Sequence, residues 1–100
     1  MAGRTLRWTP EADEDLDKIL AFYRERNGNS EYGDKLVKKF GKVLNNVLFS
    51  PYLGQRRGKR GSRFVIVYPF QLFYRVTKTE IIVTAVWDGR RDPKTLKLTR

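Results

Sequence analysis

The spacing of hydrophobic residues changes once along this 100-residue chain, and this change constrains the fold more than any other feature. Between residues 10 and 49, apolar residues recur every three or four positions, as they do along one face of an α-helix. Between residues 62 and 87, Val, Ile, Phe and Tyr gather in short runs that are typical of strands. The chain therefore predicts an α+β fold in which a helical part precedes a sheet.

The helical part contains signals for two helices. Thr9 is expected to be the N-cap of the first helix, with Pro10 at its first position, and Asn27-Gly28-Asn29 ends it. Ser30 is expected to cap the second helix, which Ser50-Pro51 ends. Because a short polar turn joins the two helices, we expect an antiparallel pair. The apolar faces comprise Ala12, Leu16, Ile19, Leu20 and Tyr23 in the first helix and Gly33, Leu36, Val37, Phe40, Val43, Leu44, Val47 and Leu48 in the second.

Four strands are predicted around this helix pair. They cover residues 3–8 before the helices and, after them, residues 62–68, Phe70–Val76 and residues 81–87. Turn signals at Pro69 and at residues 77–79 make the last three strands an antiparallel meander. We therefore expect one domain, residues 1–100, in the order strand, helix, helix, three strands, with a small antiparallel sheet that the helix pair covers on one face. The other face stays open for a partner.

Two aromatic residues are neighbours in the strand Phe70–Val76. Side chains alternate along a strand, so one of Phe73 and Tyr74 must face the helices and belong to the core. We expect the other to pack against a neighbouring strand rather than to stack on a nucleic-acid base.

The composition excludes several kinds of site. The chain contains no Cys and no His, which excludes disulfides, Ser-His and Cys-His triads, zincin sites and histidine-based nucleases. We expect neither a metal nor another cofactor. No apolar run approaches the roughly 18 residues that a membrane helix needs, and residues 1–9 lack the apolar core of a secretory signal. The expectation is a cytoplasmic protein without membrane contact.

The formal net charge of +10 is concentrated in one half of the chain. Residues 1–50 contain nine Lys and Arg against eight Asp and Glu, whereas residues 51–100 contain twelve against three. Such a field favours a polyanion or a strongly acidic protein as partner, because phosphates or carboxylates offset the charge and its self-repulsion. A basic surface that only maintains solubility is the alternative.

Four segments carry a resemblance to a known family. They are Trp8-Thr9-Pro10-Glu11-Ala12 with Leu16 and Ile19, Ser50-Pro51-Tyr52-Leu53-Gly54, Phe70–Val76, and Val86-Trp87-Asp88-Gly89-Arg90-Arg91-Asp92-Pro93. In their order and spacing the chain resembles the RelE/ParE superfamily, toxins of bacterial type II toxin–antitoxin pairs that include plasmid-stabilisation-like proteins. The resemblance implies the same strand, helix, helix, three-strand fold. It also implies a small acidic antitoxin that folds across the helix pair and covers the basic sheet, in a toxin–antitoxin hetero-oligomer.

Two mechanisms occur among the similar proteins. RelE-like members enter the ribosomal A site and cut messenger RNA, whereas ParE-like members inhibit DNA gyrase without being nucleases. Against the RelE-like pattern, Gln71 stands in place of a third-strand arginine and brings no positive charge. Arg90 or Arg91 matches the arginine that follows the fourth strand. The family's carboxyl-terminal tyrosine or histidine has no counterpart in residues 93–100.

The remaining RelE-like positions are basic or acidic. Arg63, with Lys59 and Arg60 just before it, matches the basic residues of the second strand. Asp88 is the nearest carboxylate that could accept a proton, although neighbouring arginines favour its charged form and weaken it as a base. Its alternative role is that of an ion-pairing or turn residue. A RelE-like enzyme would therefore be metal-independent and would use Arg63, Arg90 and Asp88.

The chain thus lacks the family's carboxyl-terminal tyrosine or histidine and the positive charge that Gln71 replaces. These two absences favour a ParE-like inhibitor that binds a target such as DNA gyrase. A ribosome-dependent mRNA endoribonuclease is one alternative, and a non-toxic basic module that binds nucleic acid or an antitoxin is another. The residues expected to bind nucleic acid or a target protein are Arg56, Arg57, Lys59, Arg60, Arg63, Gln71, Arg90 and Arg91. For the run 56–63 the alternative is a solvated hairpin edge that discourages aggregation. For the last two arginines it is a solvent-facing pair that anchors the chain terminus to Asp88 or Asp92.

Overall fold

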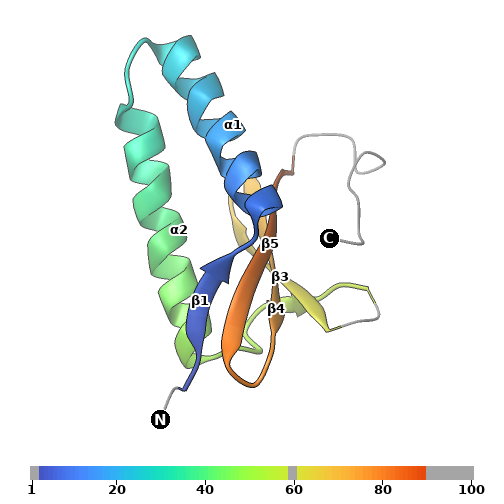
Figure 1. Cartoon of the computed structure of the whole chain (residues 1–100). Helices are drawn as coiled ribbons and strands as arrows, with labels where there is room; N and C mark the ends of the chain where they lie inside the picture. The colour runs from blue at the N-terminus through green and yellow to red at the C-terminus, as the bar shows by residue number, and fades with distance from the viewer. Residues whose placement is uncertain (1–2, 59–60, 90–100) are drawn as a thin grey trace.

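The computed structural model describes residues 3–58 and 61–89, and two helices lie against one face of a five-stranded sheet (Figure 1). In chain order the elements are β1 (Thr5–Trp8), α1 (Pro10–Asn27), α2 (Glu31–Phe49), β2 (Gln55–Arg56), β3 (Ser62–Val67), β4 (Phe70–Val76) and β5 (Glu80–Asp88). The predicted α+β class and element order are confirmed. Strand β2 was not predicted, because two residues are too few for a periodic signal. No helix in residues 3–58 and 61–89 is long and apolar enough to cross a membrane.

Helix α1 begins and ends at the residues that its sequence signals indicate. The Oγ1 atom of Thr9 accepts a hydrogen bond from the N–H of Ala12 at 3.1 Å, and Pro10 is the first helical residue. At the other end, Gly28 has φ 76° and donates its N–H to the carbonyl oxygen of Arg24 at 2.9 Å. Only glycine adopts this left-handed conformation without strain, so Gly28 ends the helix.

Helix α2 starts at the predicted place but with different capping chemistry. Ser30 has φ −97° and ψ 5°, outside the extended region that lets an N-cap side chain accept from the helix. Its hydroxyl instead donates to Oδ2 of Asp34 at 3.2 Å, and the Oδ1 of Asn29 accepts from the N–H of Glu31 at 3.0 Å. The prediction that the Ser30 side chain caps the helix is therefore wrong.

The sheet has the strand order β1-β5-β4-β3-β2 and is mixed. The pairs β2–β3, β3–β4 and β4–β5 are antiparallel, as predicted for the meander, but β1 runs parallel to β5, with Leu6 opposite Ile81 and Trp8 opposite Val83. The expectation of a wholly antiparallel sheet is wrong for this pair. The reason is that the helix pair returns the chain to the end of the sheet where β1 starts (Figure 1). The short β2 runs opposite to β1, and each hairpin after it reverses the chain, so β3 and β5 both run in the direction of β1.

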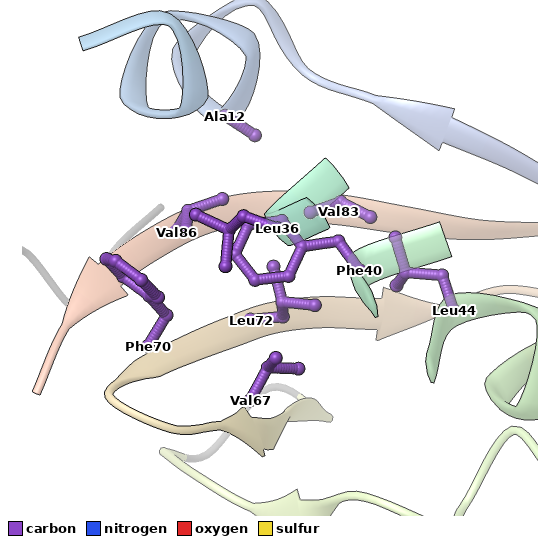
Figure 2. Packing of buried hydrophobic residues seen from close by; sticks show 9 residues of the cluster. All are labelled: Ala12, Leu36, Phe40, Leu44, Val67, Phe70, Leu72, Val83 and Val86. Atoms are coloured by element: carbon purple, nitrogen blue, oxygen red, sulfur yellow. The ribbon is translucent and has the colours of Figure 1, made fainter. Parts of the chain in front are cut away.

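The core lies between the helix pair and the sheet. Its main cluster comprises Ala12, Leu36, Phe40, Leu44, Val67, Phe70, Leu72, Val83 and Val86 (Figure 2). The rings of Phe40 and Phe70 meet edge to face, with centroids 5.9 Å apart. Val37, which was predicted on the apolar face of α2, is exposed. It follows the buried Leu36 directly and therefore points about 100° away from it around the helix.

The two neighbouring aromatic residues of β4 behave as predicted. Tyr74 is buried with Val47 and Ile81 in a second cluster beneath α2. Phe73 lies on the face that the helices leave uncovered and packs across strands against Phe64, with ring centroids 5.6 Å apart. The uncovered face of the sheet is therefore partly apolar.

Candidate partner-binding site

The described residues of the predicted site fall at two ends of the sheet. Arg56 and Arg63 lie directly opposite each other in the β2–β3 pair, and Arg57 closes that hairpin by donating its backbone N–H to the carbonyl oxygen of Ser62 at 2.8 Å. Gln71 and Asp88 lie at the other end, where β4 and β5 pair. The predicted contacts Lys59, Arg60, Arg90 and Arg91 lie outside the described residues.

The three residues of the RelE-like set that would have to act together are not all adjacent. Arg63 is opposite Tyr74, and Asp88 is opposite Phe70, four residues earlier on the same strand. At about 3.3 Å per residue, this separation is about 13 Å along the sheet. The position of the third member, Arg90, falls outside the described residues. Arg63 and Asp88 therefore do not form a joint site by direct contact.

The guanidinium group of Arg63 holds a loop in place. Its Nη1 atom donates to the carbonyl oxygen of Gly54 at 2.9 Å and to that of Tyr52 at 3.3 Å. The Cζ atom lies 4.9 Å from the centroid of the Tyr52 ring, in a cation–π contact. Arg63 therefore joins β3 to the loop between α2 and β2.

Tyr74 is a second anchor of this loop and was not predicted as one. Its hydroxyl donates to the carbonyl oxygen of Pro51 at 2.8 Å and accepts from the N–H of Gly54 at 2.9 Å. Burial raises the pKa of Tyr74 above 10.0, while the Gly54 hydrogen bond and the Arg63 charge oppose the shift. The phenol therefore stays protonated at neutral pH and acts as a structural donor rather than as a general base. We name these Tyr74 and Arg63 hydrogen bonds to residues 51–54 the loop staple.

Gly54 is the point at which the loop approaches the sheet most closely. A Cβ atom at this position would lie 2.6 Å from the Tyr74 Oη atom and 2.7 Å from the carbonyl oxygen of Phe64. No side chain fits there without moving the loop. The motif Ser50-Pro51-Tyr52-Leu53-Gly54 therefore contains a glycine because the tyrosine hydroxyl needs direct access to the backbone.

Gln71 lies where the chain leaves β5 toward residues 90 and 91. It is half-buried and opposite Trp87, and Gly89 donates its N–H to the carbonyl oxygen of Pro69 at 2.7 Å. A Cβ atom on Gly89 would lie 2.9 Å from that oxygen and 4.0 Å from the Gln71 Nε2 atom. The end of β5 is thus closely packed against the turn that precedes β4, and the neutral amide of Gln71 lies beside it.

The geometry is accompanied by clear similarities to known proteins. A family model described as the ParE toxin of the type II toxin–antitoxin system parDE matches residues 6–93. The chain belongs to the ParE toxin family. It is 28% identical to Toxin ParE3 of Caulobacter vibrioides (strain ATCC 19089 / CIP 103742 / CB 15) over 90 residues, which cover 88% of each protein.

Two solved structures share the fold of this ParE-family chain. One is from the chromosomal ParDE TA system of P. aeruginosa, with a TM-score of 0.70 and 24% identity over 86% of this chain and 96% of that one. The other is YafQ from E. coli strain BL21(DE3), with a TM-score of 0.52 and 17% identity over 85% and 92% of the two chains. At these identities the likeness concerns the fold alone. The predicted superfamily is confirmed by the family model and the curated relative.

Proposed function

We propose that this ParE-family chain is a toxin that arrests bacterial growth by binding a target protein such as DNA gyrase, and that a cognate acidic antitoxin neutralises it. The observation that carries the proposal concerns Arg63, the one described arginine of the RelE-like set. Its Nη1 atom donates to two backbone carbonyl oxygens, and it lies about 13 Å along the sheet from Asp88. Inhibition by binding does not require a general base next to this arginine.

RNA cleavage makes demands for which this chain has few candidate residues. The reaction requires a group that removes the 2'-hydroxyl proton and donors that stabilise a charged phosphorane. The chain has no His, Gln71 carries no charge, and the hydroxyl of the buried Tyr74 donates a hydrogen bond to the carbonyl oxygen of Pro51. Loss of one transition-state donor lowers a rate by on the order of 100- to 1000-fold.

The antitoxin part of the proposal is supported by charge and by the family. Residues 51–100 carry twelve basic side chains against three acidic ones. The family is that of the toxins of the type II toxin–antitoxin system parDE. A disordered acidic segment that folds on this surface gains apolar burial and charge pairing together. The exposed apolar residues of the helix pair, Phe22, Tyr32 and Val37, offer such a segment an apolar track.

The test combines two assays on the purified protein. One measures supercoiling by DNA gyrase, and the other maps RNA ends in a translating extract. We expect inhibited supercoiling with intact transcripts. Codon-positioned cuts that vanish in Arg90→Ala but persist in Lys78→Ala, which removes one charge from an exposed turn, would overturn the proposal if supercoiling is untouched.

A cellular experiment tests toxicity and neutralisation. Induced expression should arrest growth, and co-expression of the protein encoded beside this one should restore it and yield a complex that co-purifies at moderate salt. Harmless expression at a verified soluble level would instead favour the non-toxic binding module.

A further inference from the structure

Three large apolar side chains are exposed together where α2 ends. They are Phe49, Tyr52 and Leu53, with 78%, 62% and 57% of their surfaces accessible. We name these three residues the apolar platform. Single exposed apolar residues are common on proteins, but three within five residues form a patch of the kind that marks an interaction site.

The platform is held rigidly. The Leu53 N–H donates to the carbonyl oxygen of Ser50 at 2.9 Å, and the loop staple fixes the backbone of residues 51–54. These bonds keep Tyr52 and Leu53 from folding back onto the sheet. An apolar surface that is both exposed and pre-ordered binds with a smaller entropic cost than a mobile loop does.

The charged residues nearest to the platform in the sequence are all basic. Arg56 and Arg63 lie opposite each other on β2 and β3, and Arg63 stacks on the Tyr52 ring. No Asp or Glu occurs in the sequence between Asp34 and Glu80. A surface that complements this one therefore combines apolar side chains with carboxylates at their border.

The position of the platform favours a folded partner over a disordered one. Figure 1 shows the end of α2 at the opposite end of the molecule from the turn between α1 and α2. A segment that folds on binding gains most by wrapping a long surface, such as the helix pair and the uncovered sheet face. A small rigid projection fits a concave site in a protein that is already folded.

We propose that the apolar platform is the surface through which this chain docks onto the folded protein that it inhibits, in a concave site where carboxylates border apolar residues. The inference rests on the proposed function and adds to it the residues that make the contact. Tyr52 and Arg63, which stacks on its ring, belong to the residue types that dominate binding energy in protein interfaces.

The experiment compares a double and a single variant of the full chain. Phe49→Ser/Leu53→Ser removes the platform's apolar side chains that lie outside the loop staple. Tyr68→Ser is the control, because it removes an exposed aromatic residue, 84% accessible, from the turn between β3 and β4. Circular dichroism and melting curves establish that both variants fold as the wild type does. Each protein is then assayed for gyrase inhibition, growth arrest and co-purification with the protein encoded beside it.

The expected result is a selective loss of target inhibition. The platform variant should need on the order of 10- to 100-fold more protein for half-inhibition of supercoiling, and the control should stay within about 2-fold of wild type. The platform variant should also fail to arrest growth at equal soluble levels.

Other results separate the failure of this inference from the failure of the proposed function. Undiminished inhibition and growth arrest by the platform variant would overturn the inference and leave the proposed function standing. If that variant instead lost only the co-purifying neighbour, the platform would belong to the antitoxin, and the inference would again be wrong. If the wild type arrests growth without inhibiting supercoiling, gyrase is excluded as the target. The inference is then tested by growth alone: it stands if the platform variant fails to arrest growth and is overturned if that variant arrests growth as the wild type does. A wild type without either effect overturns both.

Discussion

Replacement of Tyr74 by Phe tests the loop staple with the smallest possible change. The substitution removes one oxygen from a buried ring and leaves the apolar packing against Val47 and Ile81 in place. It deprives the Pro51 carbonyl of its donor and the Gly54 N–H of its acceptor. Two buried or half-buried backbone groups then lose their partner at once.

The magnitude follows from the two lost bonds. A net hydrogen bond contributes about 0.5–1.5 kcal/mol, and an unsatisfied buried group costs about 1–3 kcal/mol. We expect Tyr74→Phe to lower the free energy of unfolding by about 2 kcal/mol. In a domain of this size that corresponds to a fall in Tm of roughly 8–16 °C.

Urea denaturation followed by circular dichroism measures the effect, with Tyr68→Phe as the control. Tyr68 is 84% exposed, so loss of its hydroxyl should change the free energy of unfolding by less than about 0.5 kcal/mol. The slope of the unfolding free energy against urea should be equal in both variants. A Tyr74→Phe protein as stable as the control would refute the reasoning, because the staple would then contribute nothing to the folded state.

Two further predictions concern the same region. Gly54→Ala should lower the free energy of unfolding by about 1–3 kcal/mol, because its Cβ would clash with Tyr74 and Phe64. The control Gly41→Ala, in open space on α2, should raise the free energy of unfolding by up to about 1 kcal/mol. Thermal melts in which the two variants shift in the same direction would contradict this prediction. Stability should also fall as the pH rises above 10.0, because the unfolded chain then loses the Tyr74 proton that the folded chain retains with its raised pKa. In denaturation series at increasing pH, the free energy of unfolding should decline less in Tyr74→Phe than in the wild type. An equal decline in the two proteins would disprove the raised pKa of Tyr74 as the cause.

The parts of the fold that were predicted correctly depend on local chemistry. Thr9-Pro10 and Gly28 define the ends of α1 through bonds to residues three or four positions away, which a sequence pattern contains in full. The parallel pairing of β1 with β5 joins residues that are 75 positions apart in the sequence. It depends on where the helix pair and the strands between them place the chain, which no local pattern contains. The Ser30 cap was wrong for a related reason, because Asn29 competes for the same helix end and the backbone torsions decide between them.

The candidate site shows the same division. Charge and the RelE-like pattern pointed to Arg63, but the backbone carbonyls that hold its guanidinium group come from residues 52 and 54, which β2–β3 pairing brings to it. Its contact with a partner remains a prediction. Tyr74 could have been singled out, because a tyrosine on the inward face of a strand needs a hydrogen-bond partner for its hydroxyl. The glycine that donates its N–H to this hydroxyl lies twenty residues earlier, and only the folded sheet brings the two together.

The loop staple links the stability of the core to the presentation of the apolar platform. Tyr74 is packed under α2 by residues of the second core cluster, and its hydroxyl fixes the backbone beside Tyr52 and Leu53. Ordering a free loop costs about 1–2 kcal/mol per residue, and in this chain that cost is met when the protein folds rather than when a partner binds. Weakening the staple should therefore have two separable effects. It should lower the free energy of unfolding, and in molecules that remain folded it should lower affinity at the proposed docking surface without changing any platform side chain.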